Sequence, residues 1–238
     1  MQQCRLCHRL ENLRDSHIVP EFLYRPLRND ARQMSGINGR GPHGRRLIQR
    51  GLTEHLLCDT CEQFLSKNYE TPFLRSWLES PALPQSSEIG YTHLITVEYE
   101  VFKLFHLSIL FRASVSTLSS FSAVALGPHE ERIRLSLLNR DPGDDWQYPI
   151  AGCLVVHDRT KVVIYIVGMP RQYRIGPHRI YTFLYAGVNW EFGVSTHRND
   201  HFNSRALKRN GTIALHAVPW NDLPVMQEAA RALRGTDA

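Results

Sequence analysis

The chain has 238 residues, of which 42% are hydrophobic and 21% are charged, and this ordinary globular balance excludes wholesale disorder. Its 28 basic and 23 acidic side chains leave a net charge of +5. The longest apolar stretch, residues 101–111, is too short to cross a bilayer, and the first residues lack the apolar segment of a secretory signal, so we expect a cytoplasmic protein without a membrane partner.

Short strands, a loop and a helix are predicted in the first 80 residues. Pro20 ends the first strand, and glycine, proline and arginine dominate the loop. Apolar residues then recur at helical spacing. In chain order, the predicted segments are a strand over residues 15–19, a helical turn or two over 21–27, a loop over 28–50, a strand over 52–57 and a helix over 58–68.

Residues 81–87, with the sequence PALPQSS, are the best candidate for a linker. Beyond them the apolar pattern first has a helical period and then a period of two. Asn221 is a candidate N-cap for the last helix. The predicted helices cover residues 99–117, 129–141 and 222–234, and the predicted strands cover residues 152–157, 161–167, 179–186, 188–194 and 212–218. We therefore expect residues 88–238 to form a domain of mixed helices and antiparallel sheet.

The cysteines are spaced for a metal ion. Five cysteines in a cytoplasmic chain argue against a disulfide framework. Two identical C-x-x-C pairs, Cys4 with Cys7 and Cys58 with Cys61, can present four thiolates to one tetrahedral zinc ion. Alternatively, the cysteines form a redox dithiol or are buried by chance. The presence of a second pair with the same spacing makes both alternatives less favoured. Cys153 stands alone in an apolar segment and is expected to be a buried strand residue.

Arginine is concentrated near these cysteines. Residues 1–50 contain ten arginines, no lysine and four acidic residues. Guanidinium groups pair well with phosphate oxygens, so this excess fits contact with nucleic acid. A solvated basic loop is the other interpretation. The arginines expected to contact phosphate are Arg40, Arg45, Arg46 and Arg50.

The segment between the cysteine pairs adds a more specific motif. His17, Ile18, Val19 and Pro20 follow the first pair, and Leu56 and Leu57 directly precede the second. The order C-x2-C, SHIVP and LLC-x2-CE resembles the zinc-containing branch of the HNH endonucleases, also called ββα-metal nucleases. The resemblance covers about residues 1–75. It implies an α+β protein in which a zinc-anchored ββα-metal module, residues 1–80, precedes the linker and the second domain.

The resemblance also implies a reaction and its residues. A metal-dependent endonuclease of this kind hydrolyses DNA phosphodiester bonds, which requires a base for water and a cation for the developing charge. His17 corresponds to the base, and Glu62 stands where the family has its last metal ligand. The ion would be magnesium or manganese, while the four cysteines hold structural zinc. Glu70 and His55 are weaker candidates for the catalytic ion.

One departure from the family pattern bears on the metal site. Ser16 stands where the family has a metal ligand, and hydroxyl groups are poor ligands for hard divalent cations. Asp15 is one residue earlier and would point to the opposite face of a strand. On an uninterrupted helix, Glu70 would lie about 80° around the axis and about 12 Å along it from Glu62, too far apart for the two to share one ion.

Two other classes of function stay open at this stage. A zinc-ribbon module without catalytic activity would bind nucleic acid or a protein through the same arginines. Alternatively, the zinc unit is a structural staple, and the second domain carries the function through substrate recognition, partner binding or dimerisation. For an active nuclease, the resemblance implies a role in phage defence or a mobile element, with DNA or RNA as substrate, a protein activator and a homodimer as expected partners.

Overall fold

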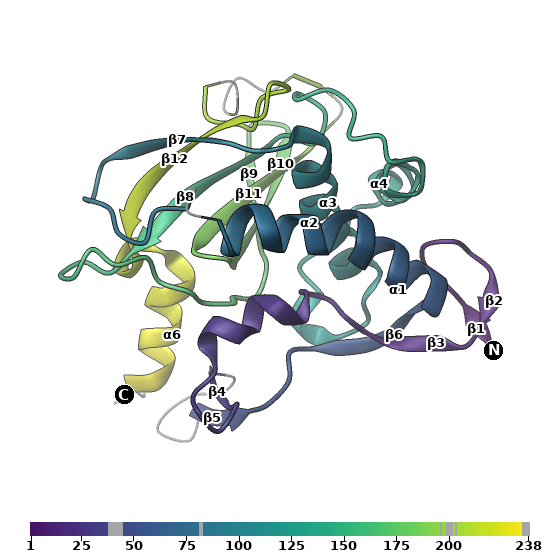
Figure 1. Ribbon diagram of the computed structural model, residues 1–238, viewed down its shortest axis with the longest axis horizontal. Coiled ribbons are helices and arrows are strands. Elements are labelled where there is room, and N and C mark those ends of the chain that lie inside the picture. The colour runs from purple at the N-terminus through teal and green to yellow at the C-terminus, as the bar shows by residue number, and fades with distance from the viewer. Residues whose placement is uncertain (38–44, 81–82, 196, 199–201, 203, 235–238) are drawn as a thin grey trace.

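The computed structural model describes residues 1–37, 45–80, 83–195, 197–198, 202 and 204–234 (Figure 1). The chain has an α+β fold, in which short N-terminal strands and a long helical segment precede a six-stranded sheet and its helices. Within the described residues, none of the helices has both the length and the apolar character that crossing a membrane requires.

A ββα unit forms the N-terminal part. Strand β3 (Leu13–His17) pairs antiparallel with β6 (Thr53–Cys58), and α1 (Asp59–Leu65) follows β6 directly. This confirms the expected succession of strand, strand and helix, although β3 starts two residues earlier than predicted and ends at His17. Strands β1 (Gln2–Gln3) and β2 (Leu10–Glu11) form a second small ladder at the chain start.

The loop predicted over residues 28–50 is wrong in part. A 3₁₀-helix, η1 (Glu21–Leu27), precedes it, and strands β4 (Met34–Ile37) and β5 (Arg45–Ile48) pair antiparallel within it. The glycine at position 36 favours a loop in the sequence. In the ladder it lies opposite Arg46, and a Cβ at this position would meet the Ile48 side chain at 3.0 Å, so the glycine serves close packing between two strands.

The predicted helix over residues 58–68 is too short. A continuous helical rod runs through α1, the π-helical turn η3 (Ser66–Glu70), α2 (Thr71–Phe73) and a second π-helical turn, η4 (Leu74–Leu78). Pro72 lacks an N–H and its ring would clash with the carbonyl of residue 68 in a regular α-helix. A wider turn upstream, closed by the bond from Thr71 N–H to the Ser66 carbonyl, avoids that clash.

The large sheet has the strand order β7-β12-β8-β11-β10-β9. All neighbouring pairs are antiparallel except β12 with β8, which is parallel, so the expected purely antiparallel sheet is wrong at this pair. Its strands are β7 (Thr92–Thr96), β8 (Ile150–Val156), β9 (Arg171–Ile175), β10 (His178–Tyr185), β11 (Val188–Val194) and β12 (Thr212–Pro219).

Three predictions in this region are corrected. Residues 161–167 form no strand and make only isolated bridges, through Val162 and Val163. Two edge strands, β7 and β9, were not predicted, because most of their residues are polar and only Ile95 among them is buried. Asn221 lies inside the 3₁₀-helix η6 (Trp220–Asp222), and α6 (Pro224–Arg234) begins after it, so Asn221 is no N-cap.

The helices α3 (Tyr99–Val115) and α4 (Pro128–Asn139) agree with prediction to within two residues. One cluster of buried apolar side chains includes residues from the zinc unit, the rod, α3 and the sheet. In its centre the Phe73 ring stacks on Phe105 of α3, with centroids 3.7 Å apart. At the far end of the rod, the Trp77 indole N–H donates to the Ala186 carbonyl at 3.2 Å.

The segment predicted as a linker also packs against the rest of the protein. Leu83 is buried, and the Val163 N–H donates to the Gln85 carbonyl at 2.9 Å. The apolar core is continuous across this segment. The predicted domain boundaries, residues 1–80, 81–87 and 88–238, therefore stay a prediction.

We predict that Phe73→Ala lowers the free energy of unfolding by about 3–5 kcal/mol, because it leaves a cavity between the rod and α3. Leu135→Ala, on a side chain that is 43% exposed, is the control and should change stability by less than about 0.5 kcal/mol. Urea unfolding followed by fluorescence measures both. Similar small losses in the two variants would contradict a shared core.

Candidate functional site

The four cysteines of the two C-x-x-C pairs come together at one end of the ββα unit. Their sulfur atoms all lie within 4.8 Å of one another, and the Sγ atoms of Cys7 and Cys58 are 3.8 Å apart. Cys4 and Cys7 lie between β1 and β2, whereas Cys58 ends β6 and Cys61 belongs to the first turn of α1. Four thiolates at these distances fit one structural zinc ion.

Hydrogen bonds to sulfur support this arrangement. The Cys58 N–H donates to the Cys4 sulfur at 3.3 Å, and the Arg9 Nε donates to the Cys7 sulfur at 3.4 Å. Such bonds stabilise thiolates and orient them toward a metal. The Arg5 N–H donates to the Leu56 carbonyl at 3.0 Å, which joins the first cysteine loop to β6 independently of any metal. Within the described part of the chain, no second group of three or more His, Cys, Asp or Glu ligand atoms gathers as closely.

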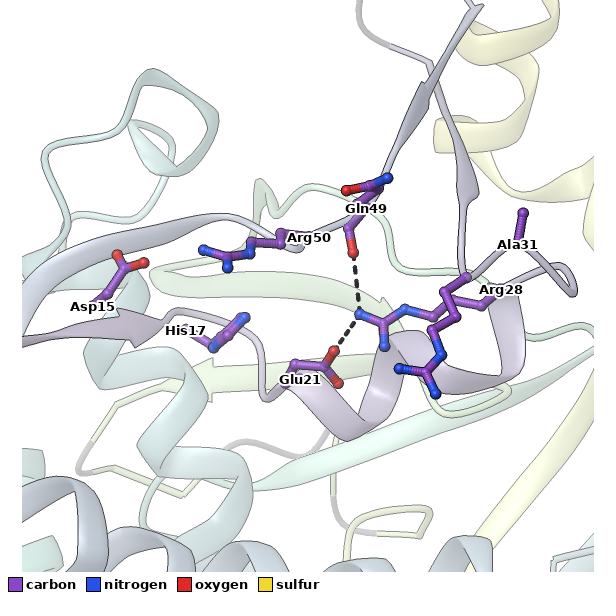
Figure 2. A pocket seen from close by; sticks show the side chains of 8 residues that line it. Asp15, His17, Glu21, Arg28, Ala31, Gln49 and Arg50 are labelled. Atoms are coloured by element: carbon purple, nitrogen blue, oxygen red, sulfur yellow. Dashed lines mark hydrogen bonds and ion pairs between the residues drawn. The ribbon is translucent and has the colours of Figure 1, made fainter.

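A pocket of about 590 Å³ opens beside the last residue of β3. Figure 2 shows the His17 ring between the side chains of Asp15 and Glu21, with Arg50 on the facing segment. Successive strand residues alternate in direction, so Asp15 and His17 face the pocket while Ser16 is buried behind them. The lining residues are Asp15, His17, Glu21, Arg28, Ala31, Arg32, Gln49 and Arg50.

Three arginines and two carboxylates line the pocket around the imidazole. Arg28 makes an ion pair with Glu21 and donates to the Gln49 carbonyl at 3.2 Å, so its guanidinium is fixed (Figure 2). Arg32 occupies a tight turn with φ of 57° and is exposed. Arg28 and Arg32 were missed as individual site residues, although both belong to the arginine excess that predicted phosphate contact.

The imidazole of His17 is partly buried, and its Nε2 atom has no hydrogen-bond partner among the described residues. Burial lowers the pKa of His17 below its ordinary value, and Arg112 acts in the same direction, whereas Glu21, Asp15 and Glu70 oppose it. A lowered pKa favours the neutral ring at neutral pH, and a neutral imidazole has one nitrogen that can accept a proton.

Behind β3 lies a second, buried group of charges. Ser16 Oγ accepts a hydrogen bond from the Leu57 N–H at 3.1 Å. Burial raises the pKa of Glu62, an effect that the Arg112 charge and the Ser16 hydroxyl oppose. The Glu62 Oε1 atom is buried without a hydrogen-bond partner in the described structure. Glu70 pairs with Arg112 at 2.9 Å between Oε1 and Nη1.

The π-helical turn changes the expected relation between Glu62 and Glu70. Closed by longer-range bonds, it contains more residues per turn than an α-helix and rotates each residue less about the axis. Glu70 therefore turns back toward the face of Glu62, and both carboxylates interact with Arg112. The angle of about 80° expected for an uninterrupted helix does not apply.

The remaining candidates fall in different places. His55 is exposed on β6, opposite Asp15 in the ladder, and does not line the pocket. Of the predicted phosphate contacts, Arg50 lines the pocket. Arg40 and the side chains of Arg45 and Arg46 lie outside the described residues, so their roles stay predictions. Cys153 lies in β8 as expected, partly rather than fully buried.

Comparison of the chain with protein-family models, with curated proteins and with solved structures found no match. The resemblance to the zinc-containing HNH endonucleases therefore rests on the motif and on the ββα geometry, and it stays a prediction.

We predict one zinc ion per chain in the purified protein, bound by the four cysteine sulfurs. Cys58→Ser should lose the ion and much of the fold's stability, because structural zinc contributes directly to folding. Cys153→Ser, which removes the cysteine in β8, should retain it. Elemental analysis by mass spectrometry measures the number of zinc ions per chain. One zinc ion per chain in Cys58→Ser would refute this set of ligands.

Proposed function

We propose that the protein is a metal-dependent endonuclease of the HNH type that hydrolyses DNA phosphodiester bonds at the pocket beside His17. The observation that carries this proposal is the imidazole of His17, which ends β3 and lines a pocket with three arginines in a ββα unit, and whose buried Nε2 has no hydrogen-bond partner among the described residues. A neutral imidazole beside a phosphate site is the arrangement that general-base hydrolysis requires.

In the proposed mechanism, His17 takes a proton from the attacking water. Arg32 and Arg50 bind non-bridging phosphate oxygens at the open side of the pocket, where both are exposed. Arg28 is paired with Glu21 and donates to the Gln49 carbonyl, so its guanidinium has a fixed orientation in the pocket wall. Together they orient the phosphodiester so that its phosphorus faces the water that His17 activates.

Glu62 is the residue that would hold a magnesium or manganese ion, although it lies behind β3 and does not line the pocket. Its buried Oε1 has no hydrogen-bond partner in the described structure, and Mg²⁺ in such enzymes uses one or two carboxylates together with water and substrate phosphate. When bound, the ion would supply positive charge for the departing oxygen. Ser16 accepts a hydrogen bond from the Leu57 N–H and is not required as a ligand.

A binding module without catalysis is the second candidate, and one observation favours it. Glu70, the other predicted carboxylate, is already neutralised by Arg112, which leaves Glu62 as the one carboxylate in the Glu62–Glu70 pair without an ion-pair partner. In that case the pocket arginines would still bind nucleic acid. The wider expectations, a role in phage defence or a mobile element, a protein activator, a homodimer and cytoplasmic location, depend on the nuclease proposal.

We predict that His17→Ala slows nicking of supercoiled plasmid by about 100-fold or more, the usual contribution of a general base. His216→Ala, which changes an exposed histidine on β12, should cut at the wild-type rate. Zinc-loaded protein is compared with and without added magnesium or manganese, so that loss of structural zinc is not confused with loss of the catalytic ion.

Each outcome of this assay is informative. Cleavage that depends on His17 and on the added ion supports the proposal, and single-stranded DNA and RNA oligonucleotides then define the substrate. Binding without cleavage by wild-type protein would favour the binding module. Equal cleavage by wild type and His17→Ala would assign the chemistry to another residue.

We predict that Arg50→Ala weakens DNA binding similarly for unrelated sequences, because a phosphate contact carries no base information. The slope of log K against log salt should become less steep by about 0.7–0.9, as expected for one lost contact. Arg159→Ala, an exposed arginine far along the chain in a turn after β8, is the control. Fluorescence anisotropy at several salt concentrations measures the slope, and an unchanged slope in Arg50→Ala would exclude this contact.

A further inference from the structure

Arg112 is the most buried charged group near His17. It lies in the last turn of α3, and its side chain is only 1% exposed. A guanidinium removed from water is costly unless each donor has a partner. Arg112 Nε donates to the Ser108 carbonyl and Nη2 to the Ser108 hydroxyl, both at 3.3 Å, so one side of the group is held by its own helix.

The other side of the guanidinium reaches the proposed site. Nη1 donates to the His17 carbonyl at 3.0 Å and lies 2.9 Å from Glu70 Oε1. One side chain thus joins the end of β3, the π-helical turn and α3, three elements that are far apart in sequence. Since His17 is the last residue of β3, the bond to its carbonyl fixes the backbone from which the imidazole enters the pocket.

We infer that Arg112 is a positioning residue for His17, which it holds through the His17 carbonyl while Glu70 serves as its counter-ion. This inference rests on the proposed function for the role of His17, but the contact itself does not. It assigns Glu70 to the support of the base rather than to the metal. It also means that residues beyond the predicted linker complete the site, because α3 supplies the guanidinium.

The charges around His17 allow a test that needs no substrate. Asp15 on the same strand, Glu21 in η1 and Glu70 in the π-helical turn all favour the imidazolium, whereas Arg112 from α3 opposes it. The pocket adds three arginines, Arg28, Arg32 and Arg50. Changing Arg112 or Glu70 should therefore move the titration of His17 in opposite directions.

The experiment is an NMR titration of the full, zinc-loaded chain with labelled histidines, in which His17→Gln assigns the His17 signal. Arg112→Met should raise the pKa of His17, because a nearby positive charge is lost. Glu70→Gln should lower it, because a negative charge is lost. The signals of the other histidines serve as internal references.

Arg112→Met leaves Glu70 without its counter-ion and can fail to fold, so the double variant Arg112→Met/Glu70→Gln removes both charges together. Its His17 pKa should lie between those of the single variants. If Arg112→Met unfolds, the test compares Glu70→Gln with the double variant. The pKa of His17 should then be higher in the double variant than in Glu70→Gln. Unchanged His17 titration in folded variants would overturn the inference. Absence of cleavage by wild type would instead count against the proposed function.

Discussion

The cluster of four cysteine sulfurs joins two parts of the chain that are 51 residues apart, measured from Cys7 to Cys58. A ββα unit with one short ladder and one helix cannot bury enough apolar surface to order a segment of that length by itself. A shared zinc ion would supply this stabilisation and hold β6 against the first loop. Because β6 pairs with β3, the same constraint fixes where β3 ends and therefore where His17 lies.

Apolar and ionic contacts then connect this unit to the rest of the fold. Phe73 and Trp77 of the rod pack into the core that α3 and the sheet form. The position of Arg112 depends on the same packing. Its guanidinium reaches Glu70 only because α3 lies against the rod. A buried ion pair adds little net stability compared with an apolar pair, but leaving either partner alone is costly. This pair therefore constrains geometry more than it stabilises the fold.

The sequence predicted what local spacing determines. The cysteine pairs, the strand that ends near His17 and the helix after Cys58 depend on neighbouring residues, and the structure has them. The orientation of Glu70 depends on a π-helical turn that Pro72 favours but no apolar period indicates. Arg112 lies in a helix that is otherwise almost entirely buried, and only tertiary packing shows that it faces the end of β3.

The pocket and the buried charges lie on opposite sides of β3. Exposed Arg32 and Arg50 face solvent on the pocket side of β3, whereas Glu62, Glu70 and Arg112 are held behind it. Exposed arginines bind phosphate with little dependence on the buried groups, so affinity for nucleic acid alone does not distinguish a nuclease from a binding module. The distinction depends on the buried side, because a buried carboxylate without an ion-pair partner, that of Glu62, adds nothing to phosphate affinity. Its desolvation is costly in a protein that only binds, whereas in a hydrolase the same carboxylate would hold a cation.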